Sequence, residues 1–339
     1  MERILEVNNL STSFFTHLGE VQAVRGNTFS VERGEILGIV GESGSGKSVT
    51  AMSIMGLVDQ PGRIKEGEIL FRGENLVKKS KAEMSQLRGK EISMIFQDPM
   101  TSLNPVFTIK NLMIEVIKRH QKVSKKEALE IAIEKLGMVG IPEPEKRINS
   151  YPHEFSGGMR QRAMIAMALS CNPQLLIADE PTTALDVTIQ AQILDIMRDL
   201  SEKIDTSIMI ITHDLGVIAE TCHNVIVMYG GLIMEKGPVD EIFYNPQHPY
   251  TKGLLKSIPR MDKKNLQGRL VPIAGSPPDL LNPPKGCPFS TRCEYAMNQC
   301  IDQPAPTYQV KEGHSSACWL LHENAPKVEG FVKGCEIVE

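Results

Sequence analysis

The chain has 339 residues, of which 41% are hydrophobic and 23% charged, and a formal net charge of −4. This length fits one large domain with an appendage, and the weak negative charge excludes a nucleic-acid binder that relies on a strongly basic surface. The sequence has no apolar run long enough to cross a membrane and no secretory signal at its start, so we expect a cytoplasmic protein whose membrane role depends on a partner.

The first part of the chain predicts strands that lead into a loop and a helix. Residues 4–40 alternate apolar and polar positions around turn residues, which is typical of β-strands. The continuous apolar run 36–40 enters the glycine-rich segment 41–48 (GESGSGKS), and residues 47–57 then carry apolar side chains at helical spacing. This order of strand, glycine-rich loop and helix is that of a phosphate-binding loop.

The middle of the chain predicts a helical insertion followed by a buried βαβ unit. Residues 108–120 and 125–136 are amphipathic helices, and no strand is evident near them. The apolar runs 175–178 and 207–211 are typical of parallel strands that are buried on both faces, and a helix at 188–200 connects them. We therefore expect an α/β core of the P-loop type with an inserted helical subdomain.

The sequence changes character at about residue 257, where it becomes rich in proline and cysteine and loses its apolar periodicity. A segment with so little core of its own needs a cross-link to hold a shape. In a reducing compartment its thiols are expected to stay reduced or to bind metal. We predict a nucleotide-binding domain at 1–256, with a helical subdomain at about 98–165 and an N-terminal antiparallel β layer, and a small irregular C-terminal domain at 257–339.

The glycine-rich segment fits the nucleotide-binding pattern G-x-x-x-x-G-K-[ST]. Lys47 provides a positive charge for the β- and γ-phosphates, and the Ser48 hydroxyl is placed to bind Mg²⁺. The predicted strand after the helical insertion ends in Asp179 and Glu180, at the sheet edge where α/β proteins bind ligands. We expect Asp179 to hold Mg²⁺ through water and Glu180 to act as the general base for the attacking water.

Residues 155–162 (FSGGMRQR) resemble the signature motif of ATP-binding-cassette (ABC) proteins, with Met159 where glutamine is more usual. A serine and two glycines begin an apolar helix there, so free N–H groups and the helix dipole form a second anion site. Two separate phosphate sites in one chain imply that two chains face each other head to tail. Each signature motif then covers the ATP that is bound by the partner's phosphate loop.

Further ABC elements follow in the expected order over residues 4–255. Gln97 resembles the Q-loop glutamine, Asp186 the D-loop aspartate and His213 the switch histidine. The resemblance implies that Gln97 touches Mg²⁺ and water, and that His213 positions the γ-phosphate and orients the general base. It also implies that Phe14 stacks on adenine, with Phe15 as its rival.

The resemblance thus implies an ATPase with ATP and Mg²⁺ as cofactors and a defined set of site residues. The expected catalytic residues are Glu180, His213, Gln97 and Lys47. The expected Mg²⁺ ligands are Ser48, Gln97 and Asp179. The expected nucleotide contacts are Phe14, Gly41, Ser43, Gly44, Ser45, Gly46, Lys47, Ser48, Val49, Gln97, Ser156, Gly157, Gly158, Asp179 and Asp186.

A single cassette with a short helical insertion and without sustained heptads favours a transporter over ABC proteins of DNA repair, chromosome organisation or translation. Residues 245–251 and the following Leu254 and Leu255 resemble the end of the cassette in dipeptide/oligopeptide and nickel importer ATPases. Within that segment His248 and Tyr250 are expected to form a capped turn without a chemical role. Peptide import is the expected function; import of nickel or another solute, and a soluble ABC ATPase that remodels ribosomes or DNA, remain alternatives.

The same resemblance implies the partners and the location of the chain. The expected partners are a second cassette, a paralogue rather than an identical chain, and two transmembrane permease subunits. One permease would insert a coupling helix near Gln97, an extracytoplasmic binding protein would be coupled indirectly, and no nucleic acid is expected. The chain would lie peripherally on the cytoplasmic face of the cell membrane.

Four C-terminal cysteines have the spacing C-x5-C-x6-C-x17-C, which is not the paired C-x2-C spacing of zinc ribbons. Members of the peptide-importer subfamily with this pattern are associated with a [4Fe–4S] cluster, and four thiolates are what such a cluster needs. The resemblance implies a structural cluster on Cys287, Cys293, Cys300 and Cys318. Zinc and four unliganded thiols remain alternatives, and Cys335 is a rival fourth ligand.

Overall fold

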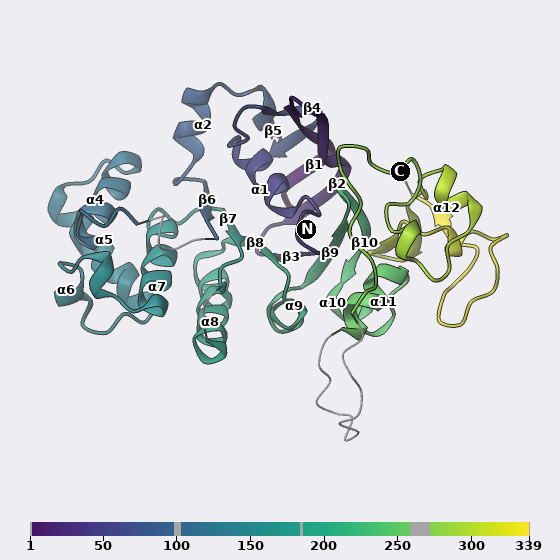
Figure 1. The fold of residues 1–339 in the computed structure, drawn as a ribbon. Coiled ribbons are helices and arrows are strands. Elements are labelled where there is room, and N and C mark those ends of the chain that lie inside the picture. The colour runs from purple at the N-terminus through teal and green to yellow at the C-terminus, as the bar shows by residue number, and fades with distance from the viewer. Residues whose placement is uncertain (1, 98–102, 184–185, 258–271, 339) are drawn as a thin grey trace, which may run out of the picture.

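The computed structural model describes residues 2–97, 103–183, 186–257 and 272–338. Its N-terminal part forms a four-stranded antiparallel sheet (Figure 1). In spatial order its strands are β2 (Gly19–Glu32), β1 (Arg3–Thr16), β4 (Gly62–Phe71) and β5 (Glu74–Asn75). The predicted antiparallel β layer is therefore present.

The centre of the molecule is a nine-stranded mixed sheet, and the five strands at one end of it run parallel. These five are, in spatial order, β9 (Asn224–Tyr229), β3 (Ile36–Val40), β8 (Ser207–Thr212), β7 (Leu175–Asp179) and β6 (Ile92–Ile95). The predicted strands 36–40, 175–178 and 207–211 match β3, β7 and β8. The P-loop α/β core expected from the sequence is confirmed.

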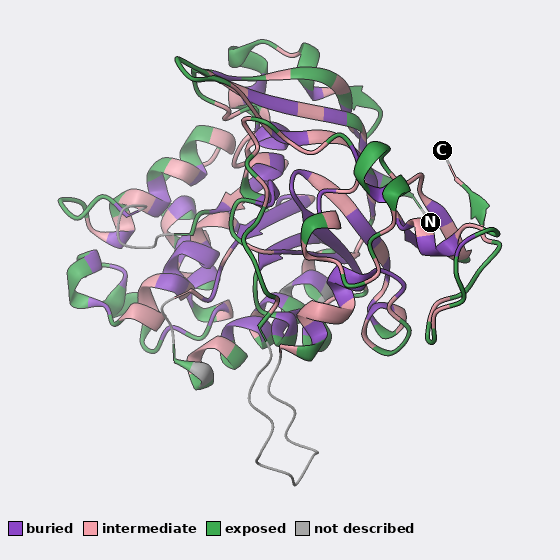
Figure 2. Cartoon of the chain, turned by 45° about the vertical axis from the view of Figure 1, so that its right-hand side comes forward, coloured by how far each residue is buried: buried purple, intermediate pink, exposed green. Residues whose placement is uncertain are grey.

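Both faces of this sheet are covered, as the continuous apolar runs predicted. Along β8, Ile208 and Ile210 belong to one hydrophobic cluster, whereas Met209 and Ile211 belong to another, because side chains alternate between the two faces of a strand. The antiparallel sheet and α1 (Lys47–Met55) cover one face, and α8 (Val187–Ile204) and α9 (Leu215–Thr221) cover the other (Figure 1). Figure 2 shows the buried residues concentrated in the central sheet and around it.

The helical insertion lies beside the sheet on the opposite side from the C-terminal region (Figure 1). It contains α4 (Ile109–His120), α5 (Lys125–Met138), α6 (Pro144–Arg147) and α7 (Gly157–Ala168). The sequence-predicted helices 108–120 and 125–136 match α4 and α5 to within two residues. A capping box between Ser124 and Glu127 begins α5, and the Thr108 side chain caps α4.

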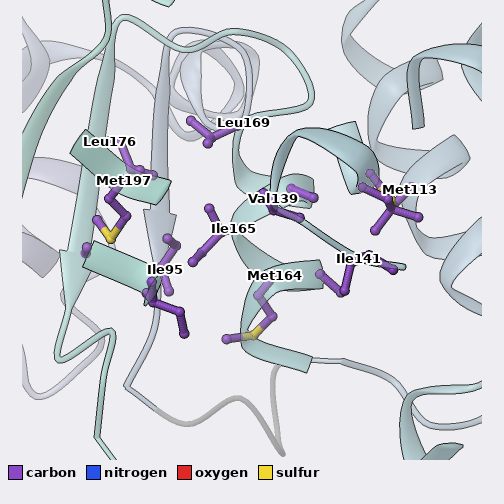
Figure 3. Packing of buried hydrophobic residues seen from close by; sticks show 14 of the residues in the cluster. Ile95, Met113, Val139, Ile141, Met164, Ile165, Leu169, Leu176 and Met197 are labelled. Atoms are coloured by element: carbon purple, nitrogen blue, oxygen red, sulfur yellow. The ribbon is translucent and has the colours of Figure 1, made fainter. Parts of the chain in front are cut away.

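The insertion is joined to the core by apolar side chains of α7 (Figure 3). Met164, Ile165 and Leu169 lie between the sheet residues Ile95 and Leu176 and the apolar side chains of the insertion. One continuous hydrophobic cluster therefore extends from the sheet into the helices. Any rotation of the insertion relative to the sheet would have to shift the apolar side chains that join them.

The C-terminal region is more regular than its sequence suggests. The strands β10 (Leu232–Pro238), β12 (His314–Ser316), β11 (Tyr308–Lys311) and β13 (Glu336–Ile337) continue the central sheet in antiparallel pairing. The described residues also form the α-helices α2 (Lys81–Leu87), α10 (Val239–Tyr244), α11 (Pro249–Lys256) and α12 (Asn298–Asp302). Within the described ranges, none of the helices has the length and apolar character that crossing a bilayer requires.

Candidate functional site

The predicted nucleotide residues converge because of the strand order. The strands β3, β8, β7 and β6 are parallel neighbours, so their carboxyl ends meet at one edge of the sheet. Asp179 is the last residue of β7, and the phosphate loop, His213 and Gln97 follow β3, β8 and β6. Residues that are far apart in sequence thus share one edge.

The phosphate loop needs glycine at its two tightest points. A Cβ atom on Gly41 would lie 2.1 Å from the Met228 carbonyl oxygen, and one on Gly46 would lie 2.4 Å from the Ala23 carbonyl oxygen. Gly46 also has a φ of +99°, which favours glycine. The loop can therefore take this shape only with glycine at both positions.

Lys47 is directed back into the loop. Its side chain is buried, and its Nζ donates hydrogen bonds to the carbonyl oxygens of Gly41 at 2.7 Å and Glu42 at 3.1 Å. Burial lowers the pKa of this ammonium, and the charges of Glu180 and Asp179 act in the opposite direction. The positive charge is thus held among the main-chain groups that surround a nucleotide phosphate.

A hydroxyl and a carboxylate meet beside this loop. Ser48 Oγ donates a hydrogen bond of 3.1 Å to Asp179 Oδ1. Burial raises the pKa of the Asp179 carboxyl, while the bond from Ser48 lowers it. Hydroxyl and carboxylate oxygens are the donors that Mg²⁺ prefers, so this pair provides a suitable position for the cation.

Glu180 lies at the centre of a small hydrogen-bond network. It accepts bonds from Gln97 Nε2 at 2.9 Å and from Thr183 Oγ1 at 2.8 Å, and His213 Nδ1 lies 3.2 Å from its Oε1. Burial raises the pKa of Glu180, but the bonds from Thr183 and His213 outweigh it and leave the pKa below its usual value. The carboxylate is therefore ionised and held in a fixed orientation, as a general base requires. The sequence predicted three of these residues and missed Thr183, which belongs to no motif that was recognised.

The two rival aromatic residues lie in different surroundings. A Cβ atom on Gly62 would lie 2.7 Å from the Phe14 ring and 2.7 Å from Val58, which follows α1 closely in the chain. Phe15 is instead covered by Arg63, whose guanidinium lies 4.2 Å from the ring centre. Phe14 thus lies close to Gly62 and Val58, whereas Phe15 lies against Arg63.

The signature residues form a separate site at the start of α7. Ser156 caps the helix by accepting a hydrogen bond from Met159 N at 3.3 Å. A Cβ atom on Gly158 would lie 2.8 Å from Ile189 on α8, and the Asp186 side chain caps that helix by accepting from Ile189 N at 3.0 Å. The signature motif and Asp186 are therefore adjacent. Among the described residues, no hydrogen bond joins them to the phosphate loop of the same chain.

Comparison with known proteins agrees with this arrangement. A family model described as "ABC transporter" matches residues 24–183, and one described as "Oligopeptide/dipeptide transporter, C-terminal region" matches residues 234–300. The chain is 59% identical to the oligopeptide transport ATP-binding protein OppD of Bacillus subtilis (strain 168) over 96% of this chain and 91% of that protein. It is 54% identical to the dipeptide transport ATP-binding protein DppD of Lactococcus lactis subsp. cremoris (strain MG1363) over 96% and 93%. The chain belongs to this family of ABC transporter ATP-binding proteins.

A solved structure supports the fold in the same way. The dimeric post-hydrolysis state of an ATP-binding cassette bound to ADP and Pi matches with a TM-score of 0.62 and 26% identity, over 69% of this chain and 98% of that one. The chain is the ATP-hydrolysing subunit of an ABC importer. The family resemblance inferred from the sequence is confirmed.

The cassette also has contacts at its phosphate loop that no motif predicted. His248 caps α11 by accepting a hydrogen bond from Tyr250 N at 3.0 Å, so the expected capped turn is present. The Tyr250 hydroxyl, however, accepts a bond of 2.9 Å from the Glu42 main-chain N–H. The Glu42 carboxylate in turn pairs with Arg292 of the C-terminal region. Both contacts join the phosphate loop to later segments of the chain.

The predicted cysteine ligands come together in the C-terminal region. A small cavity is lined by Cys287, Cys293, Cys300 and Cys318, and Cys335 is not part of its lining. Burial raises the pKa of the Cys287 thiol to about 12 and that of Cys293 to about 11. Across the described ranges, no three His, Cys, Asp or Glu side chains lie close enough together to hold a single metal ion.

Proposed function

We propose that this chain powers the import of dipeptides and oligopeptides. The observation that carries the proposal is similarity over nearly the whole chain, C-terminal region included, to OppD of Bacillus subtilis and DppD of Lactococcus lactis. The oligopeptide/dipeptide C-terminal model matches residues 234–300, and the described residues of this range lie largely outside the nucleotide edge. The alternative of a soluble ABC ATPase acting on ribosomes or DNA offers no explanation for that part of the chain.

For the reaction, we propose that Glu180 activates the attacking water and that His213 and Gln97 orient it. The hydrogen-bond network around the Glu180 carboxylate supports this division of roles. Lys47 would bind the β- and γ-phosphates. Mg²⁺, held by Ser48 and Asp179 with Gln97 nearby, would neutralise charge on the phosphates. The roles of the other expected contacts, including the stacking of Phe14 on adenine, rest on their positions in the matched motifs.

We also propose a two-cassette arrangement, because the signature residues and the phosphate loop are separate within one chain. The solved cassette with a similar fold is dimeric and holds ADP and Pi. In this chain the start of α7 carries free N–H groups near Ser156, and Asp186 lies beside it. A second cassette, a paralogue rather than an identical copy, would place its own phosphate loop there.

A groove between the core and the helical insertion supports docking of a permease. Its volume is about 480 Å³, and it lies beside Phe96, next to Gln97. Methionine is prominent in its lining, and the flexible thioether chain adapts to an inserted helix. The methionines are Met55, Met94, Met164 and Met167. We propose that this groove receives a coupling helix from one of two transmembrane permeases. This contact would hold the chain on the cytoplasmic face of the membrane. Through the permeases, the chain would be coupled indirectly to an extracytoplasmic binding protein.

The chain also has to be divided into domains. We propose a nucleotide-binding domain at 1–256 and a C-terminal domain at 257–339, with the helical subdomain at about 98–165. The start of that subdomain at residue 98 lies outside the described residues. The pairing of β12 with β10 means that the C-terminal domain is built onto the cassette rather than tethered to it.

We further propose that Cys287, Cys293, Cys300 and Cys318 bind a structural [4Fe–4S] cluster. The donor set fits, because four thiols line one cavity and Cys335 is not part of its lining. The spacing of these cysteines is not the paired C-x2-C spacing of zinc ribbons, which is why we propose the cluster ahead of zinc. Iron and acid-labile sulfide in anaerobically purified protein would support it, and zinc without either would reject it.

Reconstituted transport tests the substrate. The chain would be assembled with its permeases and paralogous cassette in proteoliposomes, and ATP-dependent uptake of labelled dipeptides, longer peptides and nickel would be compared. We expect peptide uptake that requires both ATP and the binding protein. Uptake of nickel alone would support the solute-importer alternative. Failure to associate with any permease would instead support a non-transport ATPase.

A further inference from the structure

The phosphate loop contains a carboxylate in a place where negative charge should hinder nucleotide binding. Glu42 is the second residue of the loop, and its main-chain oxygen accepts a hydrogen bond of 3.1 Å from Lys47 Nζ. The charge of the Glu42 carboxylate also acts on the Lys47 ammonium. ATP brings several negative charges to this loop, so an unpaired carboxylate there would repel them.

Arg292 pairs with this carboxylate from outside the cassette. Its Nη1 donates to Glu42 Oε2 at 2.8 Å and its Nη2 donates to Glu42 Oε1 at 3.1 Å, which is a two-pronged contact. The Arg292 side chain is only 4% exposed, whereas Glu42 is 25% exposed. Such a buried, geometrically matched pair is screened far less by salt than a surface pair.

All N–H donors of the Arg292 guanidinium group are hydrogen-bonded, and this fixes its position. Its five donors make five hydrogen bonds, and the remaining three go to the Tyr229 hydroxyl at 2.8 Å and to the carbonyl oxygens of Ile273 at 3.0 Å and Ala274 at 2.9 Å. Arg292 also lies in the single helical turn 290–292 between two cysteines of the cavity, Cys287 and Cys293. The C-terminal domain thus determines where this charge lies.

We propose that Arg292 is a positioning residue for ATP binding. It neutralises Glu42 and fixes the position of that carboxylate, so the C-terminal domain contributes to nucleotide affinity although it lies outside the cassette. Tyr250 fixes the same residue from a second direction, since its hydroxyl accepts a bond from the Glu42 N–H. The proposal concerns ATP binding and does not depend on the transported substrate or on the metal content of the cysteines.

The test uses the full-length chain and a fluorescent ATP analogue, with binding measured at equilibrium. Arg292→Met leaves the Glu42 carboxylate unpaired, and we expect affinity to fall by roughly tenfold, within the usual range of coupling between sites. The double variant Arg292→Met/Glu42→Gln removes the carboxylate as well, so we expect affinity to return to within about twofold of wild type. In the assembled transporter, KM for ATP should change in the same pattern while kcat at saturating ATP stays near wild type.

A purely structural role predicts a different pattern. If Arg292 only stabilises the fold, Arg292→Met lowers the unfolding temperature but leaves the affinity of the folded protein unchanged, which overturns the proposal. A double variant as weak as the single one also overturns it, because the defect would then not come from the exposed carboxylate. Lys135→Met removes a similarly buried cation in the helical insertion and is the control for general destabilisation. If Arg292→Met does not fold, Arg292→Gln carries the same comparison with a polar side chain in place.

Discussion

The nucleotide edge and the C-terminal cysteine region are built by different means. At the edge, each functional side chain follows a strand of one parallel sheet, so the strand order itself brings Lys47, Asp179 and Glu180 together. In the C-terminal region residues 272–307 form no strand; Cys287, Cys293 and Cys318 lie in loops and Cys300 lies in the short helix α12. There the positions depend on individual contacts with the cassette.

Those contacts include the pairing of β12 with β10, the packing of Phe289 against Tyr229 and Tyr250, and several buried polar bonds. The Glu235 side chain of β10 is fully buried and accepts hydrogen bonds from His314 Nε2 at 2.8 Å and from His248 N at 3.1 Å. Arg292 makes another buried polar contact, with Glu42. The comparison indicates that loss of one side chain at the sheet edge leaves the fold intact but impairs ATP hydrolysis. In the C-terminal region, loss of one contacting side chain should instead disturb the local fold and leave the chemistry of hydrolysis intact.

The largest expected effect is at the nucleotide edge, where Glu180→Gln should impair ATP hydrolysis while the fold stays intact. We expect steady-state ATP hydrolysis to fall by roughly 10²–10⁴-fold, the range of a general base, while ATP binding persists and traps a cassette dimer. Hydrolysis rates and size-exclusion profiles with ATP would measure both. Turnover near the wild-type rate in this variant would contradict the assignment of Glu180.

The sequence was sufficient to predict the nucleotide edge because motif and topology coincide there. The run 36–40 and the glycines after it predicted β3 and the phosphate loop, and 175–178 predicted β7 with the two carboxylates beyond it. Each of these signals is local in sequence. Thr183 was missed because a single threonine in a turn carries no periodic or spacing signal, although its hydroxyl lies 2.8 Å from Glu180.

The C-terminal region could be predicted only in part, for the opposite reason. The family resemblance implied which thiols act together, and those four line one cavity. The strands β11 and β12 were not predicted, because they are short and become strands only through pairing with each other and with β10. The contact between Arg292 and Glu42 joins residues 250 positions apart, and nothing local in the sequence indicates it.

The next largest effect distinguishes the role of Cys318 from that of Cys335. Cys318→Ser should lose most of the bound iron and sulfide, because Cys318 lines the cavity, whereas Cys335→Ser should keep both, because Cys335 does not. Iron and acid-labile sulfide per chain, measured after anaerobic purification, would show the difference. Equal loss in both variants would indicate that Cys335 is a ligand, and full iron content in Cys318→Ser would exclude Cys318.

A smaller effect is expected where the C-terminal region contacts β10. Glu235→Gln replaces an acceptor oxygen by a donor against His314 and weakens the bonds from Gln247 and His248. We expect a loss of about 2–3 kcal/mol in the stability of the C-terminal region, as for other broken buried polar pairs. Hydrogen exchange at residues 308–321 should then rise, while β3 and β7 stay protected. Glu241→Gln, at a more exposed ion pair with Lys311, should change little.

The smallest predicted effect returns to the nucleotide edge and concerns Thr183. Thr183→Val keeps the shape of the side chain but removes the hydroxyl that donates to Glu180, while Gln97 and His213 still hold the carboxylate. We expect kcat to fall about fivefold, the rate equivalent of about 1 kcal/mol. Because that bond lowers the pKa of Glu180, its loss should raise the pKa and shift the acid limb of the rate profile to higher pH. Thr183→Ser retains the hydroxyl and should retain both the rate and the profile; an acid limb that moves equally in both variants would show that the hydroxyl does not set the pKa of the base.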